Sequence, residues 1–76
     1  MNGFPSRSAV ERMKAMYPNG TRVELIEMDD PYTKLPPGIR GTVVSVDDIA
    51  TVHIRWDNGV AIGAAYGVDR IRKLSE

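Results

Sequence analysis

A chain of 76 residues is long enough for one domain, and a domain of this size buries only about 60% of the surface of its unfolded chain. Its 10 Lys and Arg residues balance its 10 Asp and Glu residues, and zero net charge argues against strong non-specific binding to nucleic acid, which needs many phosphate contacts. The absence of cysteine excludes disulfides, thiol nucleophiles and cysteine-ligated metals, and it fits a cytoplasmic protein. No apolar run approaches the length of a transmembrane helix and no signal peptide is recognised, so we expect no membrane partner.

The N-terminal region is expected to hold a short helix. Residues 1–7 are predicted to be a flexible tail, and residues 8–76 a single domain that begins with a helix over 8–17. Ser8 and Glu11 fit a capping box, in which the serine accepts from a free backbone N–H and the glutamate reaches back. Helical spacing places four apolar side chains on one stripe, which we expect to dock on the strands: Val10, Met13, Met16 and Tyr17.

Five short strands are predicted after this helix. In the first strand Val23 and Leu25 alternate with polar residues, and Ile26 breaks the alternation, which indicates a bulge near Leu25. A 3₁₀ turn with Asp69 as a local cap is expected over 68–70, before the last strand. Five strands with a long first loop are typical of a small SH3-like antiparallel barrel. The predicted strands cover residues 21–28, 42–46, 51–56, 60–62 and 71–74.

The turn at Asp57-Asn58-Gly59 sets the register of the third and fourth strands. Asn-Gly most often forms a two-residue hairpin loop, which would place Ile54 opposite Gly63. A three-residue loop instead places Ile54 opposite Ile62 and keeps the apolar residues of both strands, Val60 included, on one face. The sequence therefore predicts a type I turn followed by a glycine in the left-handed region, where a side chain would clash.

Trp56, the only tryptophan, has two interpretations. In SH3 domains that bind peptides, an exposed tryptophan lines the groove for proline-rich segments. The position of Trp56 at the end of a strand, on the buried face and with Gly41 across from it, favours packing in the core. We expect seven side chains to be mostly buried: Val23, Leu25, Val43, Ile54, Trp56, Ile62 and Ile71.

Seven short blocks of sequence also resemble a known family. They occur in order within residues 15–74: Gly20-Thr-Arg-Val23, Met28-Asp-Asp-Pro31, Pro36-Pro-Gly38, Gly41-Thr-Val43, Val46-Asp-Asp48, Trp56-Asp-Asn-Gly59 and Gly67-Val-Asp69. Together they are similar to a family of small bacterial and phage domains of unknown function. The resemblance implies an SH3-like barrel and a phage- or mobile-element-borne setting. Because the family has no established activity, the resemblance implies no mechanism.

Two groups of residues are candidate binding sites. The loops contribute aromatic and proline side chains, which are candidates for binding a protein partner: Tyr32, Pro36, Pro37 and Tyr66. The strands contribute cations that would form a basic stripe for nucleic acid if the third and fifth strands are neighbours: Arg40, Arg55, Arg70, Arg72 and Lys73. The alternative for these cations is a solvated strand face on which they pair with nearby acids.

The sequence does not favour catalysis. His53 is the only histidine, and a metal site or a catalytic triad would need partners for it, so we interpret it as a half-exposed strand residue. Asp29-Asp30 and Asp47-Asp48 lack the spacing of a calcium loop and are interpreted as turn formers. We therefore expect the protein to be a small non-catalytic binding or adaptor module that recognises a protein partner and holds no cofactor and no metal. Nucleic-acid binding through the basic stripe is the alternative.

Overall fold

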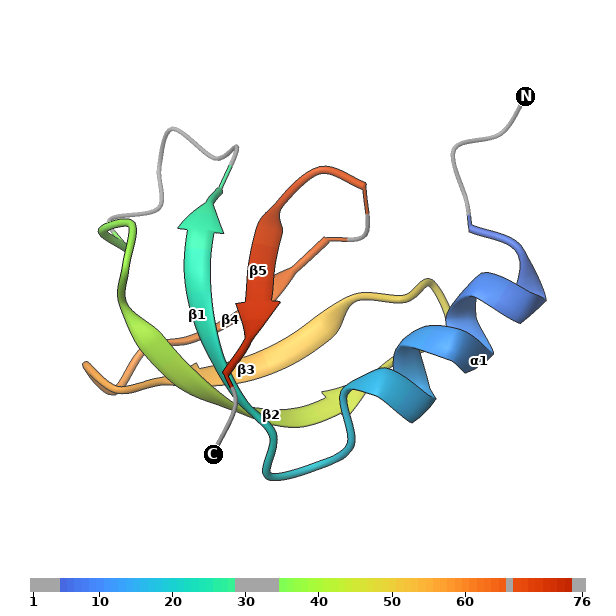
Figure 1. Cartoon of the computed structure of the whole chain (residues 1–76), viewed down its shortest axis with the longest axis horizontal. Coiled ribbons are helices and arrows are strands. Elements are labelled where there is room, and N and C mark those ends of the chain that lie inside the picture. Colours follow the sequence, from blue (N-terminus) through green and yellow to red (C-terminus); the bar gives the residue numbers. More distant parts are fainter. Residues whose placement is uncertain (1–4, 29–34, 66, 75–76) are drawn as a thin grey trace.

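The computed structural model describes residues 5–28, 35–65 and 67–74, which form one helix and five strands (Figure 1). All five strands belong to one antiparallel sheet in the order β4-β3-β2-β1-β5. The predicted fold class, mainly β with a short N-terminal helix, is confirmed. In chain order the elements are α1 (Arg7–Met16), β1 (Arg22–Glu27), β2 (Arg40–Val46), β3 (Val52–Trp56), β4 (Ala61–Ala64) and β5 (Arg70–Lys73).

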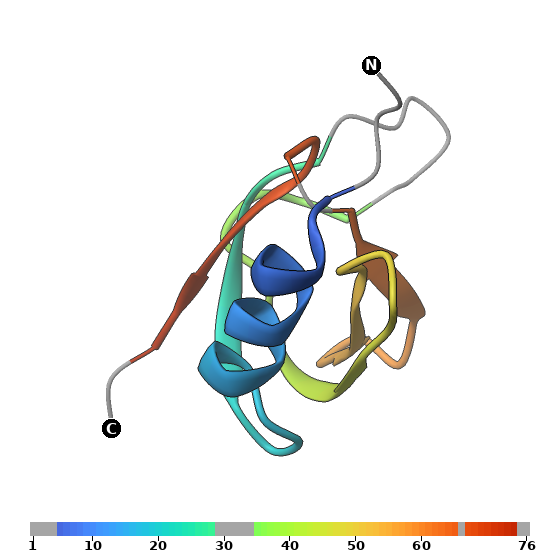
Figure 2. The same ribbon diagram turned by 90° about the vertical axis from the view of Figure 1, so that its right-hand side faces the viewer.

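The sheet is strongly curved, and β4 and β5 are its two edges. Figure 2 shows the result: β1 and β5 lie on one side of the helix, and β3 and β4 lie on the other. Within the described part of the chain no hydrogen-bonded ladder joins β4 to β5, so the sheet is not closed by hydrogen bonds. Closure into a barrel stays a prediction.

The helix α1 begins earlier than predicted and has a different N-cap. Ser6 has extended backbone angles, and its hydroxyl oxygen accepts a hydrogen bond from the Ala9 N–H at 3.1 Å. Ser8 lies inside the first turn, so the predicted capping box of Ser8 with Glu11 is wrong. The earlier start has a physical reason, because it gives the Val10 N–H an intrahelical partner, the Ser6 carbonyl at 3.0 Å. Of the predicted tail, residues 1–4 lie outside the described part of the chain.

The helix docks through a stripe that differs in part from the prediction. Ala9, Val10 and Tyr17 are buried, and Met13 is half-buried against the core of the sheet. Met16, in contrast, has 43% of its surface exposed, so its predicted place in the docked stripe is wrong. Met16 is the last residue of α1 and lies at one edge of the buried stripe. Ala9 is buried at the other edge of this stripe.

The strand β1 alternates as predicted and contains the predicted bulge. Val23 and Leu25 are buried, and the register between β1 and β5 shifts between Leu25 and Glu27. The extra residue, Ile26, follows the buried Leu25 on the opposite face and is 42% exposed.

The hairpin of β3 and β4 has the predicted three-residue loop. The Trp56 N–H donates to the Val60 carbonyl at 2.8 Å, and the Gly59 N–H donates to the Trp56 carbonyl at 2.9 Å. Gly59 has a φ of 92°, and Ile54 pairs with Ile62, so the register prediction is confirmed. Val60 lies in the turn rather than in β4 and is 37% exposed, so its expected place on the buried face is wrong.

Trp56 packs in the core, as expected. It is 1% exposed, and its indole Nε1 donates to the Ile62 carbonyl at 3.0 Å. Gly41 pairs with it across the sheet, and a Cβ atom there would lie 2.9 Å from Trp56 Cε3. Of the expected core residues, Ile62 and Ile71 are half-buried against the core, and the others are buried: Val23, Leu25, Val43, Ile54 and Trp56.

Two aspartates hold the turns beside the edges of the sheet. Asp47 Oδ1 accepts from the backbone N–H groups of Ile49 at 3.1 Å and Thr51 at 2.9 Å, which confirms Asp47 as a turn former. Asp69 Oδ2 accepts from the Ala65 N–H at 2.9 Å, as expected of a local cap. The expected 3₁₀ turn over 68–70 is wrong, because residues 67–69 form a simple turn and Arg70 already begins β5. The Asp29-Asp30 pair lies outside the described residues. No helix in the described part of the chain has the length and apolar character needed to cross a membrane.

Candidate functional site

The predicted partner-binding residues fall into two groups. Tyr32 and Tyr66 lie outside the described residues. Pro36 and Pro37 are exposed at a turn that leads into β2, and the Pro36 carbonyl accepts from the Ile39 N–H at 3.2 Å. The structure therefore places the two prolines on the surface, at a turn with a defined backbone.

The third and fifth strands, which the predicted basic stripe requires to be neighbours, are not adjacent in the sheet. Two strands, β2 and β1, separate Arg55 on β3 from Arg72 on β5. Arg72 donates to Glu24 Oε1 through Nη2 at 2.7 Å and through Nε at 3.0 Å. Arg40 lies between these two cations on β2, opposite Glu24. The two remaining cations, Arg70 and Lys73, are exposed at the two ends of β5.

An ion pair that sequence reasoning missed connects three strands on the outer face of the sheet. Arg22 on β1 donates through Nη1 to Asp57 Oδ1 at 2.8 Å and through Nη2 to Asp57 Oδ2 at 2.7 Å. On the way it crosses β2, where the same Nη1 donates to the Thr42 hydroxyl at 2.9 Å. The Arg22 guanidinium lowers the pKa of the Asp57 carboxyl. The alternation of Arg22 with the buried Val23 could have placed Arg22 on this face, but no sequence signal links it to Asp57.

His53 has a partner in the same part of the sheet. Its ring Nε2 lies 2.8 Å from Asp47 Oδ2, while Asp47 Oδ1 holds the turn between β2 and β3. The hydrogen bond to His53, followed by the bonds from Thr51 and Ile49, lowers the pKa of the Asp47 carboxyl. His53 is half-exposed, as predicted, and its partner is the residue that builds the turn.

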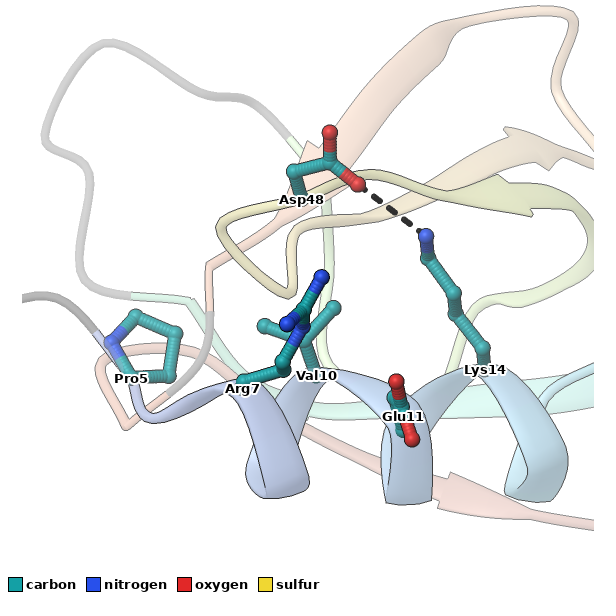
Figure 3. A pocket seen from close by; sticks show the side chains of 6 residues that line it. All are labelled: Pro5, Arg7, Val10, Glu11, Lys14 and Asp48. Atoms are coloured by element: carbon teal, nitrogen blue, oxygen red, sulfur yellow. Dashed lines mark hydrogen bonds and ion pairs between the residues drawn. The ribbon is translucent and has the colours of Figure 1, made fainter.

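A hollow of about 430 Å³ lies between α1 and the turn of β2 and β3 (Figure 3). Lys14 of the helix reaches across it to Asp48 Oδ1 at 3.0 Å, and the Arg7 side chain points the same way. The lining includes two cations and two acids, because Glu11 also faces it. The Asp48 side chain is 96% exposed, so this ion pair ties the helix to the turn in open solvent.

A smaller hollow of about 200 Å³, here called the seam pocket, lies where the two edges of the sheet approach the helix. Its wall combines the apolar side chains of Met13, Tyr17, Val52, Ala64, Ala65 and Ile71 with Gly67, Asp69 and Arg70. Burial raises the pKa of the Tyr17 phenol above its ordinary value. The seam pocket therefore offers apolar side chains next to β4 and polar ones on the side of β5.

The edge strand β4 is unusual in its chemistry. Its four residues, Ala61–Ala64, carry no charge and include no proline, whereas β5 is Arg-Ile-Arg-Lys. Edge strands are usually protected by charges, prolines or bulges. The Trp56 N–H pairs with the Val60 carbonyl, and antiparallel bonds alternate along a ladder. The backbone N–H and C=O groups of Ala61 and Gly63 therefore point away from β3, toward the side of β4 on which no described strand pairs with it.

A model of one protein family, described as a domain of unknown function (DUF4314), matches residues 6–74. The chain belongs to the DUF4314 family. The DUF4314 match begins at the N-cap of α1 and ends just after β5, so it covers the helix and every described strand. No curated protein and no solved structure matches the chain.

Several of the sequence blocks that suggested a family relation serve the fold. The Trp56-Asp-Asn-Gly59 block forms the three-residue loop, and Gly41 makes room for the indole of Trp56. Asp47 and Asp69 each hold a turn through backbone N–H groups. These sequence blocks therefore maintain the sheet and its turns, and we look for the site elsewhere on the surface.

Proposed function

We propose that this domain is a non-catalytic binding module that accepts an extended segment of a protein partner as an additional strand beside β4. The observation that carries the proposal is the uncharged edge of Ala61–Ala64, which pairs with no described strand on the side away from β3. It presents the backbone groups of Ala61 and Gly63 beside the apolar side chains of the seam pocket. In strand addition the backbone bonds supply affinity and pockets for alternate side chains supply specificity. Here the edge of β4 would supply the backbone groups, and the seam pocket would receive a side chain.

The polar side-chain pairs of the described residues support a binding role over a catalytic one. Arg22 and Asp57 link three strands, His53 binds the carboxylate that builds a turn, and Lys14 links α1 to a turn. Because these groups are engaged in holding the fold, the proposal places recognition on the backbone edge. The resemblance to bacterial and phage domains extends the proposal to a partner that is itself a bacterial or phage protein.

Selection of peptides tests the proposal. A display library of random ten-residue peptides is selected on the wild-type domain, and the selected peptides are then tested on Ala61→Pro. Proline removes the N–H that points to the free edge and leaves every bond between β3 and β4 intact, so the domain should stay folded. Ala61→Ser, which keeps the N–H, is the matched control. We expect binding to be lost in Ala61→Pro, by at least tenfold in Kd, and retained in Ala61→Ser.

A measurement on the wild-type domain makes the test independent of the variant. Addition of a selected peptide to ¹⁵N-labelled domain should shift the amide signals of residues 61–64 more than those of β5. Peptides that bind Ala61→Pro as well as wild type, or the recovery of no peptide, would overturn the proposal. Binding of labelled oligonucleotides that weakens with salt and is unaffected by Ala61→Pro would favour the nucleic-acid alternative, in which the predicted basic residues contact phosphates: Arg40, Arg55, Arg70, Arg72 and Lys73.

A further inference from the structure

We infer that the segment added to β4 carries a carboxylate side chain opposite Ala61, and that Arg55 binds this carboxylate. The inference rests on the proposed function and names the chemistry of the partner. Four observations carry it: the guanidinium of Arg55, which no described residue binds, the small neighbour Ala61, an equivalent contact elsewhere in the same sheet, and the seam pocket on the opposite face.

Arg55 is a cation without a partner in the described part of the chain. It lies on β3, is exposed, and its side chain forms no hydrogen bond or ion pair with any described residue. Its outer-face neighbours differ, because Arg22 binds Asp57 and Arg72 binds Glu24. Arg55 pairs across the sheet with Ala61, so only a methyl group stands between it and the free edge.

The same sheet shows that an arginine reaches a carboxylate across one intervening strand. Arg22 on β1 extends over Thr42 on β2 and binds Asp57 at the end of β3 with both guanidinium nitrogens, at 2.8 Å and 2.7 Å. Thr42 pairs with Arg55, so Asp57 lies two residues along the chain from the position directly opposite Arg22. A carboxylate directly opposite Ala61 on an added strand would require a shorter reach from Arg55, with the smaller Ala61 in the intervening position. A planar guanidinium binds a carboxylate through two parallel bonds, which favours Asp or Glu over a neutral side chain.

The inner face of the added strand meets apolar surface. Side chains alternate along a strand, so residues opposite Ala61 and Gly63 point outward, and residues opposite Ile62 and Ala64 point inward. Ile62 is half-buried, and Ala64 lines the seam pocket together with Val52 and Ile71. An apolar residue opposite Ala64 would therefore enter the seam pocket. In an antiparallel addition this apolar residue precedes the acidic residue by three positions.

Selection on two domains of opposite charge at position 55 tests the inference. The same peptide library is selected on the wild-type domain and on Arg55→Glu, and the two sets of sequences are compared. We expect wild type to enrich Asp or Glu at one position, three residues after an apolar residue, and Arg55→Glu to enrich Lys or Arg at that position. Arg12→Glu, an exposed arginine of α1 with the same charge change, is the control and should still select the acidic residue.

The outcomes separate this inference from the proposed function. For a selected peptide, replacing the acidic residue by Gln should weaken binding to wild type by about two- to fivefold, as for an exposed ion pair, and leave binding to Arg55→Gln unchanged. Selection of the same sequences by wild type and Arg55→Glu, with binding still lost in Ala61→Pro, would overturn the inference and leave strand addition standing. Binding that survives in Ala61→Pro would overturn both.

Discussion

Val43 and Val44 are adjacent on β2 and lie in opposite environments. Val43 is 1% exposed and Val44 is 47% exposed, so the same change to alanine removes methyl groups from the core in one case and from solvent in the other. We expect Val43→Ala to lower the free energy of unfolding by about 1–3 kcal/mol, and Val44→Ala to change it by less than about 0.5 kcal/mol. Urea denaturation followed by Trp56 fluorescence measures both.

A domain of this size holds only about 3–5 kcal/mol in total, so Val43→Ala should populate unfolded molecules measurably at room temperature. Equal effects of the two changes would contradict the assignment of faces on β2.

Much of the residue-scale structure could be predicted from the sequence, and the exceptions share a cause. The left-handed glycine at position 59 and the space at Gly41 follow from turn chemistry and from the one register that keeps the apolar residues on one face. The bond between Arg22 and Asp57 joins residues 35 positions apart, and local patterns carry no information on such pairs. Ala50 is a further case, because nothing in the sequence marks it as a buried alanine with a φ of 62°.

At the scale of the elements, α1 is capped by Ser6 and not by Ser8, the cap that the sequence predicted. Ser6 accepts from the Ala9 N–H, whereas Ser8 is an exposed helical residue. We expect Ser6→Ala to lower the free energy of unfolding by about 1 kcal/mol through loss of the cap. Ser8→Ala should be neutral or slightly stabilising, because alanine is the better helix former. Thermal denaturation of the two variants checks this difference, and a larger loss in Ser8→Ala would restore the capping box at Ser8.

The existence and order of the elements could be predicted more reliably than their limits. The predicted limits of each strand lie within two residues of the observed ones, because apolar alternation marks the buried middle of a strand. Helix ends depend on which side chain satisfies the free N–H groups, and the capping-box pattern pointed to Ser8 although Ser6 is the cap. The free edge of β4 could not be predicted, since strand order is decided by packing of the whole sheet rather than by any one strand.

For the whole molecule, the lowered pKa values of Asp47 and Asp57 determine how stability responds to acid. A carboxyl whose pKa is lower in the folded state than in the unfolded chain stabilises the fold above its ordinary pKa, and this contribution is lost as the pH falls through the folded value. Between pH 7 and pH 5, we expect these two carboxyl groups to change the midpoint of urea denaturation very little. Below about pH 4 we expect the midpoint to fall.

Asp47→Asn should reduce this acid dependence, because it removes the carboxyl that His53 and two backbone N–H groups stabilise. Asp48→Asn, which removes a neighbouring carboxyl that is 96% exposed, is the control and should have a smaller effect. A wild-type denaturation midpoint that stays constant down to about pH 2.5 would contradict the expectation.

The pairing of β5 with β1 has a consequence for the order in which the chain folds during synthesis. β2, β3 and β4 pair through short turns, so their hairpins form with little loss of loop entropy. The contact of Glu24 with Arg72 spans 48 residues, and β1 lacks this partner until β5 has left the ribosome. A nascent chain stalled before residue 70 should therefore expose the β5-facing edge of β1 to chaperones and proteases, and release of the last strand should complete folding in one late step.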